Sequence, residues 1–469
     1  MLKKLLNYLE DKKIVILGFG IEGESSYRFL RKHFPEKKLF VADKNLNLLE
    51  NKPELMDDMD LEVSVGNNYL NGIEEYDIIL KAPGISLKNV DISKWKNKIT
   101  SQLQLFLEFV NIFTIGITGT KGKSTTSSLM YKVLMEQNKD AYLLGNIGEP
   151  IFNDIDMFSE NSIAVIEVSS HALEFVNNSP NIAILLDIFE EHLDYYKSLE
   201  KYIEAKFNIA KYQNDNDYFI YNYDSKLMSQ WGFKYKENDC AISINNVPNS
   251  KNKVFLENNF IYYDNGNSKE ILMSIDEKME LKGMHNINNI MFILAVCEIL
   301  KLDVKLALKT IKGFKPLEHR MEFVGTFDGI DYYNDSIATI PESTMDAVKS
   351  IKNVNTIIVG GKDRGIDLSE FIEFLQKSEI ENIICLPKTG EYIYEKLKDI
   401  NVKLNKEKII LKNIKYTESL KEAVEYAKKV TKKGTVCLLS PAASSYGYFK
   451  NFEERGKLYK QYVQLGTLV

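Results

Sequence analysis

The chain has 469 residues, of which 44% are hydrophobic and 27% are charged, and a formal net charge of −6 at pH 7. The length predicts about three domains of ordinary globular composition, since domains commonly hold about 150 residues. The negative charge argues against a nucleic-acid partner, and no apolar run reaches the ~18 residues that crossing a membrane requires, so we expect neither kind of partner.

The four cysteines lie far apart and form no CxxC pair; they are Cys240, Cys297, Cys385 and Cys437. Three of them sit in apolar runs, so we expect buried free thiols in a reducing compartment. The N-terminal residues do not have the architecture of a signal peptide. Together these features predict a soluble, cytoplasmic protein.

The first predicted domain opens with a buried strand at residues 13–18, which runs into the glycine-rich turn Gly18-Phe-Gly-Ile-Glu-Gly23. A helix follows, and then a strand at 39–43 that ends in Asp43. Taken alone, this pattern is the dinucleotide fingerprint, in which the acid binds a ribose hydroxyl. It is weak evidence by itself, because many such strand ends bind other nucleotide-like groups.

Strands at 61–65 and 78–80 continue this domain. The second strand leads into the tight turn Lys81-Ala-Pro-Gly-Ile85, and open α/β sheets bind ligands at such carboxyl ends of strands. We expect the domain to end near residue 105, within an amphipathic helix over about 101–110.

An apolar run at 112–115 predicts a strand that feeds the loop Gly116-Ile-Thr-Gly-Thr-Lys-Gly-Lys-Ser-Thr-Thr126, and a helix follows. This order predicts a phosphate cradle, since the backbone N–H groups of the loop and the helix N-terminus face the anion. Lys123 can reach the outer phosphates, and the Ser124 hydroxyl can bind Mg²⁺. Gly119 lies only four residues before Lys123, a shorter spacing than usual. The alternative is an ordinary glycine turn with an incidental lysine; we interpret the loop as an ATP site.

The central segment alternates buried strands with polar turns. A strand at 163–168 carries Glu167 near its end, and an acid beside a phosphate loop is a suitable Mg²⁺ ligand; a helix-capping acid is the alternative. A strand at 182–187 precedes His192, whose place in a polar turn favours a ligand or orienting role over a structural one. An amphipathic helix that carries Lys206 follows.

Residues 213–280 have short apolar runs broken by Asn- and Asp-rich turns, which predicts an antiparallel excursion at the sheet edge. A long apolar helix follows, and the asparagines of its first turns, Asn289 among them, either cap it or reach a purine. The last third of the chain predicts a strand pair ending at 332–339 and buried strands at 383–386 and 436–439, among others. Alternating strands and helices there indicate a small doubly wound sheet.

Four motifs, in order along the chain, resemble those of the ATP-dependent Mur ligases, and most closely those of the members that add glutamate. They are Gly116–Thr125, Glu167 with Ser169-Ser170, His319-Arg320 with Asn334-Asp335-Ser336, and Ser440-Pro-Ala with Phe449-Lys-Asn-Phe-Glu-Glu-Arg-Gly456. The resemblance implies an α/β protein of three domains. These are a Rossmann-like UDP-binding domain at 1–105, a central P-loop ATPase domain with a mostly parallel sheet at 106–315, and a Rossmann-like amino-acid-binding domain at 316–469.

The resemblance also implies roles for residues of this chain. The UDP-substrate contacts would be Gly18, Phe19, Gly20, Ile21, Asp43, Pro83, Gly84 and Asn146. The ATP contacts would be Gly119, Thr120, Lys121, Gly122, Lys123, Ser124, Thr125, Asn289, Arg320 and Asp335. The incoming glutamate would be held by Thr339, Arg364, Ser445 and Phe452. The catalytic residues would be Lys123, Glu167, His192 and Lys206. Two Mg²⁺ sites would use Ser124, Glu167, His192 and Lys206, the last as a carbamate.

The reaction implied by the resemblance is the ATP-dependent addition of D-glutamate to UDP-N-acetylmuramoyl-L-alanine through an acyl phosphate, in peptidoglycan precursor synthesis, by a monomer. Ile337, Ile340 and Gly447 depart from the family pattern, and they fall in the amino-acid-binding domain. An enzyme that adds L-glutamate and works with an epimerase is therefore an alternative. The stretch His171-Ala172 instead resembles the members that add a diamino acid.

Three other functions explain the sequence less well. A Rossmann oxidoreductase accounts only for residues 14–43. A folylpolyglutamate-type ligase lacks the N-terminal UDP domain that this chain is predicted to have. A non-catalytic UDP-sugar-binding relative predicts broken catalytic positions, yet the expected residues are intact: Lys123, Glu167, His192, Lys206 and Asp335.

Overall fold

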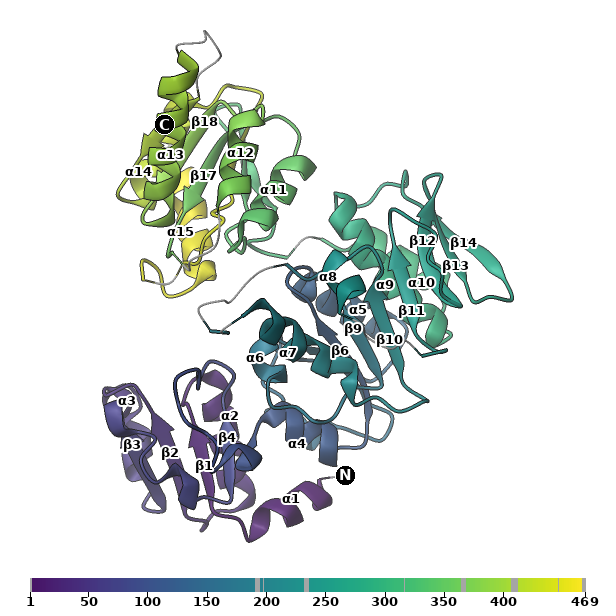
Figure 1. Ribbon diagram of the computed structural model, residues 1–469, viewed down its shortest axis with the longest axis vertical. Helices are drawn as coiled ribbons and strands as arrows, with labels where there is room; N and C mark the ends of the chain where they lie inside the picture. The colour runs from purple at the N-terminus through teal and green to yellow at the C-terminus, as the bar shows by residue number, and fades with distance from the viewer. Residues whose placement is uncertain are drawn as a thin grey trace. The chain divides into compact units, whose positions relative to one another are not determined.

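The computed structural model describes residues 2–189, 195–196, 198–231, 236–315, 317–363, 368–405, 412–445 and 447–465. These residues form two compact units, and Figure 1 labels their helices and strands. The first is built from most of the chain up to Gly313, and the second from Met279–Asn286 and the chain from Phe314 onward. Two predicted site residues, His192 and Arg364, lie outside the described residues.

The N-terminal sheet of the first unit is parallel throughout its described part, in the order β3-β2-β1-β4-β5. Its strands are β1 (Ile14–Leu17), β2 (Leu39–Asp43), β3 (Leu61–Val65), β4 (Ile78–Lys81) and β5 (Ile99–Thr100), and its helices include α1 (Lys3–Glu10), α2 (Ile21–His33) and α3 (Leu48–Asn51). Because β1 pairs with both β2 and β4, the glycine turn after β1 and the turn after β4 share one edge of the sheet.

The central sheet has the order β14-β13-β12-β11-β10-β9-β6-β8-β7 over the described residues. Its strands are β6 (Phe113–Thr118), β7 (Ala141–Gly145), β8 (Ile163–Glu167), β9 (Ile182–Leu185), β10 (Tyr218–Asn222), β11 (Cys240–Ser243), β12 (Asn252–Glu257), β13 (Phe260–Asp264) and β14 (Lys269–Ser274). The accompanying helices are α4 (Gln102–Phe109), α5 (Lys123–Glu136), α6 (Ser170–Leu173), α7 (Leu199–Lys211), α8 (Lys226–Gln230), α9 (Met284–Ile299) and α10 (Val304–Lys312).

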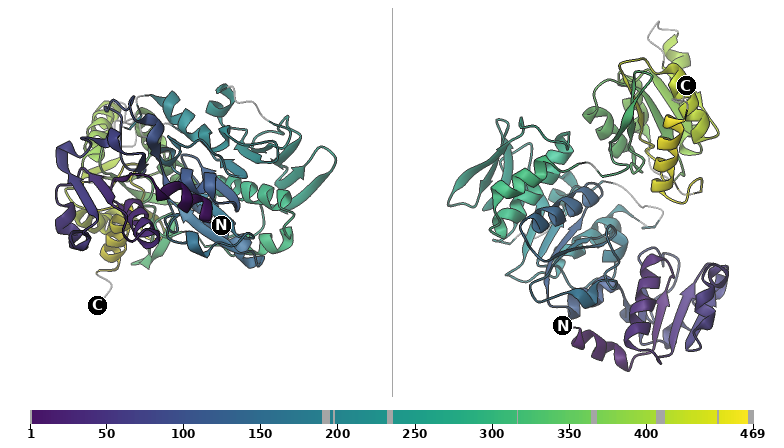
Figure 2. Two further views of the ribbon diagram at one scale, coloured as in Figure 1. Left: turned by 90° about the horizontal axis from the view of Figure 1, so that it is seen from below. Right: turned by 180° about the vertical axis from the view of Figure 1, so that it is seen from behind.

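The prediction of an antiparallel excursion over residues 213–280 was wrong for its first part. β10 and β11 extend the parallel sheet, and β12 pairs with β11 in parallel. The antiparallel pairs are β12–β13 and β13–β14, which form the outlying edge of the sheet (Figures 1 and 2). The apolar strands β10 and β11 are buried almost throughout, as is typical of strands covered on both faces in a parallel sheet.

The N-terminal and central sheets share one buried core within the first unit. The rings of Phe29 in α2 and Phe152 in the central segment have centroids 4.5 Å apart. The Gln102 amide of α4 donates to Ser26 Oγ at 2.8 Å and accepts from the Phe152 N–H at 3.2 Å. α4 therefore lies at the junction of the two sheets, and a domain boundary near residue 105 stays a prediction.

The second unit is a mixed sheet whose described strands lie in the order β15-β16-β20-β17-β18-β19. The strands are β15 (Glu322–Phe327), β16 (Ile330–Asn334), β17 (Val354–Gly360), β18 (Asn382–Leu386), β19 (Asn413–Tyr416) and β20 (Val436–Leu439). The helices are α11 (Pro341–Ser350), α12 (Ser369–Lys377), α13 (Thr389–Asn405), α14 (Leu420–Val430) and α15 (Phe452–Gln464). β15 pairs antiparallel with β16, and the other pairs are parallel. Ile357 and Ile358 belong to different buried clusters, so the sheet is covered on both faces, as the doubly wound prediction requires.

All four cysteines are buried free thiols, which confirms the expectation drawn from the three that sit in apolar runs. None of the helices in the described ranges is long and apolar enough to cross a membrane.

Candidate functional site

The predicted phosphate loop connects β6 to α5. Gly119 and Gly122 have φ values of +154° and +82°, a backbone region that favours glycine. A Cβ on Gly122 would lie 2.5 Å from Oδ1 of Asn289, and one on Gly119 would lie 2.7 Å from the Cβ of Leu186. The loop is therefore packed too closely for side chains, and its N–H groups can approach an anion. Asn289 faces this loop from α9, which favours its nucleotide-binding role over the capping alternative.

Two predicted catalytic lysines converge on one carbonyl group of this loop. Lys123 Nζ donates to the carbonyl oxygens of Gly119 and Thr120, both at 3.0 Å. Lys206, which is 2% exposed, donates from α7 to the same Gly119 oxygen at 2.7 Å. The Tyr202 hydroxyl lies 2.8 Å from Thr120 Oγ1, so α7 contacts the loop at two points.

The segment that follows β9 forms hydrogen bonds with the other side of the predicted phosphate loop. The Thr120 N–H donates to the Asp187 carbonyl at 2.8 Å, and the Phe189 N–H donates to Thr120 Oγ1 at 2.9 Å. The Lys121 ammonium lies 4.4 Å from the centroid of the Phe189 ring, a cation–π contact. His192, the predicted metal ligand that comes soon after this segment, is outside the described residues.

Glu167 ends β8 and is 2% exposed. Its Oε1 accepts a hydrogen bond of 3.0 Å from Asn146 Nδ2, while its Oε2 is buried and has no hydrogen-bond partner among the described residues. The capping alternative is wrong, because the cap of α6 is Ser169, whose hydroxyl accepts from the Ala172 N–H. A buried carboxylate oxygen without a donor is costly unless a cation binds it, so Glu167 fits a divalent ion.

Among the described residues, no group of three or more His, Cys, Asp or Glu side chains is placed so that it could hold a metal ion by itself. Mg²⁺ does not require one, since it commonly binds to one or two carboxylates together with waters and substrate phosphates. The donor set of Glu167 and the Ser124 hydroxyl at the start of α5 suits that mode of binding.

The predicted UDP site lies at the shared edge of β1 and β4. Gly18 has a φ of +91°, and a Cβ there would lie 2.5 Å from Cγ1 of Ile85, so the two turns touch. The Phe19 N–H donates to Asp43 Oδ2 at 2.6 Å. Asp43 therefore holds the glycine turn in place from the end of β2. Ile21 is 81% exposed, and nothing lies within 4 Å of a Cβ on Gly20 or Gly84, so this face is open to a ligand. Asn146, in contrast, lies beside Glu167.

Asp335 follows β16 in the second unit, and both of its oxygens accept hydrogen bonds. Oδ1 accepts from the Met321 N–H at 3.1 Å, and Oδ2 accepts from Ser440 Oγ at 2.7 Å. Because β16 and β20 are parallel neighbours, the loops with Thr339 and Ser445 leave the same edge of the sheet. Three predicted glutamate contacts are thus close to that edge, since Phe452 opens α15 and its carbonyl accepts from the Ser336 hydroxyl at 2.8 Å.

Arg455 is a residue that the sequence placed in a motif without giving it a role. Its side chain is fully buried. Its Nε donates to Ser336 Oγ at 3.0 Å, and its terminal nitrogens donate to the carbonyls of Ser336 at 2.7 Å and Ala443 at 3.1 Å. Burial lowers the pKa of Arg455 to about 9, which the nearby Asp335 carboxylate opposes. Arg455 thus ties together the two loops that follow β16 and β20. The signal that could have identified Arg455 in the sequence is a basic residue on the buried face of a helix.

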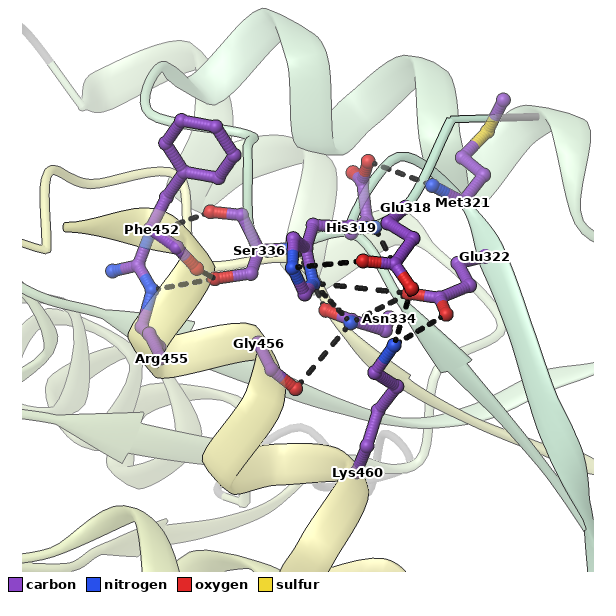
Figure 3. A network of polar contacts seen from close by, with 11 residues as sticks. Glu318, His319, Met321, Glu322, Asn334, Ser336, Phe452, Arg455, Gly456 and Lys460 are labelled. Atoms are coloured by element: carbon purple, nitrogen blue, oxygen red, sulfur yellow. Dashed lines mark hydrogen bonds and ion pairs between the residues drawn. The ribbon is translucent and has the colours of Figure 1, made fainter.

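His319 of the His319-Arg320 motif precedes β15 and is held in a polar network (Figure 3). Asn334 Nδ2 lies 2.8 Å from His319 Nδ1 and 3.0 Å from Glu322 Oε2, and Lys460 of α15 donates to Glu322 Oε1 at 2.7 Å. The Asn334 donor assigns the His319 proton to Nε2. Burial lowers the pKa of His319, although Glu322 opposes the shift. A Cβ on Gly456 would lie 2.2 Å from His319 Nδ1, so α15 fits the ring only with glycine there.

Comparison with known proteins identifies the family. Two family models match: the Mur ligase middle domain at residues 117–297 and the Mur ligase, glutamate ligase domain at residues 319–443. A protein of Clostridioides difficile (strain 630) named UDP-N-acetylmuramoylalanine--D-glutamate ligase is 33% identical, over 97% of this chain and 99% of its own length. A protein of the same name from Acetivibrio thermocellus is 30% identical, over 97% of each.

The fold has counterparts among solved structures. The crystal structure of UDP-N-acetylmuramate-alanine ligase MurC from Thermotoga maritima covers 96% of this chain and 98% of its own, at 17% identity and a TM-score of 0.57. The likeness at that identity concerns the fold, and it extends over the three sheets described above. On the family models and the full-length relatives, this chain belongs to the Mur ligases, a family of ATP-dependent, amide-bond-forming enzymes.

Proposed function

We propose that this protein joins D-glutamate to UDP-N-acetylmuramoyl-L-alanine through an acyl phosphate, as a cytoplasmic step of peptidoglycan precursor synthesis. The observation that carries the proposal is the match to relatives named for this reaction, at up to 33% identity over 97% of the chain. The open face at Gly20 and Gly84 supports a UDP-linked substrate on the N-terminal sheet. We further propose that the protein acts as a monomer, which light scattering can test.

The phosphate loop would bind the triphosphate of ATP through the backbone of Gly119–Thr125. Lys123 would leave its two carbonyl partners for the outer phosphates, where its charge stabilises the transferring phosphoryl group. Asn289 would contact the nucleotide beside Gly122. Arg320 and Asp335 are further nucleotide contacts in this proposal.

Mg²⁺, when bound, would neutralise charge between the substrate carboxylate and the γ-phosphate, two anions that must approach each other. Ser124 and Glu167 would hold one ion. The Oε2 atom of Glu167, which accepts no hydrogen bond from the described residues, supports this assignment. His192 and Lys206 would hold a second. A lysine ammonium only donates hydrogen bonds, so Lys206 would need to become a carbamate, whose oxygens are metal ligands.

The chemistry has two steps. The carboxylate of the muramoyl-alanine attacks the γ-phosphorus, which releases ADP and gives an acyl phosphate. The amine of glutamate then attacks the acyl carbon, and the tetrahedral intermediate expels phosphate to leave the amide. Thr339, Arg364, Ser445 and Phe452 would hold the incoming glutamate; the Arg364 guanidinium suits a carboxylate because its donors match it in pairs.

ATP-dependent phosphate release with UDP-N-acetylmuramoyl-L-alanine tests this proposal, with D-glutamate, L-glutamate and meso-diaminopimelate supplied separately. Release with D-glutamate alone is the expected result. Release with L-glutamate alone would overturn the D-glutamate assignment and give Ile337, Ile340 and Gly447 a role in acceptor choice. Release only with diaminopimelate would make the His171-Ala172 stretch the better guide.

A further inference from the structure

Lys81 is a buried cation at the end of β4, immediately before the turn that is proposed to bind the UDP-linked substrate. Its side chain is 4% exposed. The Lys81 ammonium lies 3.3 Å from the Ala82 carbonyl oxygen, 3.5 Å from the Pro83 carbonyl oxygen and 3.4 Å from the Tyr195 hydroxyl. Because Lys81 is buried under its own turn, it is not placed to contact a diphosphate directly.

Tyr195 joins this lysine to the central part of the first unit. Its hydroxyl lies 2.8 Å from Glu174 Oε2 and 3.1 Å from the Ile85 carbonyl oxygen. A phenol has one proton, so it donates to one of these oxygens at a time, and the bond to the carboxylate is the stronger. Lys81, Tyr195 and Glu174 therefore form a hydrogen-bonded chain from the end of β4 to the segment that follows α6.

The charged groups in and beside this hydrogen-bonded chain oppose one another's pKa shifts. Burial lowers the pKa of Lys81 to about 8, and the carboxylates of Glu174 and Glu22 oppose the shift. Burial also raises the pKa of Glu22, in the first turn of α2, to about 7, which Lys81 opposes. Tyr196 and the His171 ring pack against Tyr195, with centroids 4.9 Å and 4.1 Å away. The charges of Lys81, Glu174 and Glu22 thus influence one another, and the rings of Tyr196 and His171 contribute packing against Tyr195.

The contacts of the cluster fix the direction of the turn. The carbonyls of Ala82, Pro83 and Ile85 face Lys81 or Tyr195. In a trans peptide the N–H of the next residue points the opposite way, so the N–H groups of Gly84 and Ser86 point away from the cluster. Both residues are exposed, and a Cβ on Gly84 would meet nothing within 4 Å. Outward N–H groups in an exposed turn are suitable donors to a phosphate.

We propose that Lys81 and Tyr195 are positioning residues for the UDP-linked substrate. They hold the turn at 82–85 with its N–H groups toward the diphosphate, and they join it to Glu174 on the segment that follows the carboxylate Glu167. This inference rests on the proposed function of the turn. It assigns a role to two residues that touch neither the substrate nor the reacting atoms.

Tyr195→Phe and Lys81→Met test the proposal in the full-length enzyme, with Tyr196→Phe as the matched control. The first two variants should raise the KM for UDP-N-acetylmuramoyl-L-alanine about three- to tenfold, because a charge-assisted hydrogen bond is lost. The KM for ATP should stay within about twofold. Tyr196→Phe should leave both constants near those of the unchanged enzyme, and Lys81→Arg should restore part of the Lys81→Met loss.

Calorimetric titration with the UDP-linked substrate in the absence of ATP separates this inference from the proposed function. If the unchanged enzyme does not bind that substrate, the proposed function fails. If it binds, and Tyr195→Phe leaves both its dissociation constant and KM unchanged, the positioning role is overturned. An equal rise in the KM values for ATP and for the UDP-linked substrate would also overturn it, since general loosening of the fold has that effect. Should Lys81→Met fail to fold, Tyr195→Phe still decides the question.

Discussion

Glu167 and Asp335 are both buried carboxylates, and they differ in how completely they are bonded. Asp335 has a donor at each oxygen, from Met321 and Ser440. Glu167 has a donor at Oε1 only. Because an unbonded buried oxygen costs about 1–3 kcal/mol, the bare atom of Glu167 is the one that a cation would most stabilise. The sequence identified both acids from their motifs, but the difference in bonding became visible only with the contacts.

Glu167→Gln should lower kcat by about 10²–10³-fold while the protein remains folded. The substitution keeps an oxygen for Asn146 but removes the charge, so Mg²⁺ should no longer raise the affinity for ATP. Calorimetric titration of the enzyme with ATP, in the presence and in the absence of Mg²⁺, measures this change in ATP affinity.

Asp217→Asn is the control, because Asp217 is also a buried carboxylate of the first unit, and it accepts hydrogen bonds from Asn214 and Asn181. It should lower the thermal midpoint and leave the Mg²⁺ dependence intact. A Glu167→Gln enzyme whose ATP affinity still rises with Mg²⁺ would falsify the metal assignment.

Gly456→Ala should destabilise the second unit by about 1–3 kcal/mol, as overpacking of a filled site usually does. The new methyl group would lie 2.2 Å from His319 Nδ1. Urea unfolding followed by circular dichroism measures the change. Gly313→Ala is the control, since the nearest atom to its added Cβ is 3.7 Å away; a similar loss in both variants would contradict the steric explanation.

At the scale of elements, α15 organises the edge of the second unit that is proposed to bind the incoming amino acid. Arg455 bonds to the loops after β16 and β20, Gly456 gives room to His319, and Lys460 pairs with Glu322 (Figure 3). Arg455 and Gly456 are adjacent in α15, and Lys460 lies one turn further along the same helix. The family resemblance singled out the motif at 449–456, but no helix was predicted there, and which of its residues face β16 depends on packing that a single sequence does not encode locally.

Arg455→Lys should raise the KM for glutamate by at least about tenfold with a smaller change for the UDP-linked substrate. A lysine has one nitrogen where the guanidinium has a planar fork of three, so it would not reproduce the separate bonds to Ser336 and Ala443, and the link between the two loops would weaken. Steady-state kinetics with each substrate varied in turn measures this effect. Lys457→Met, an exposed change on the same helix, should be neutral; equal effects on both substrates would count against the assignment to the glutamate edge.

The stability of the second unit should fall as the pH drops through 6.5, the ordinary pKa of histidine. Burial holds the pKa of His319 lower in the folded state, so between the two values the unfolded chain binds more protons and acid favours unfolding. Thermal midpoints at about pH 7.5 and about pH 5.5 should therefore differ less in His319→Gln than in the unchanged protein. An equal difference in both proteins would show that other groups set the pH dependence.

For the whole molecule, the sequence predicted the three sheets and the glycine loop between β6 and α5 well, since strand patterns and glycine spacing are local signals. It misassigned β10 and β11, because Asn-rich turns between short apolar strands suggest hairpins, whereas burial on both faces made the strands parallel. It named Lys81 only as part of a turn and did not connect it with Tyr195, because the two residues are far apart in the chain and meet only in the fold. Polar residues that act through distant partners have no local signature.

The two compact units have separate buried clusters in their sheets, so we expect two transitions in scanning calorimetry of the full chain. Gly456→Ala should lower one of them and leave the other in place. The substitution lies in the second unit, so the unaffected transition would belong to the first. One transition that moves as a whole would show that the units unfold together.

Because every cysteine is buried, the protein presents no reactive thiol on its surface. Burial raises the pKa of Cys240, Cys297 and Cys437 to about 12, and it raises that of Cys385 as well, so none of them is a ready nucleophile toward alkylating dyes. A single cysteine introduced on each unit would therefore be the site of labelling in an otherwise natural chain. Such a pair of fluorophores would follow, by energy transfer, how the distance between the units changes as each substrate is added.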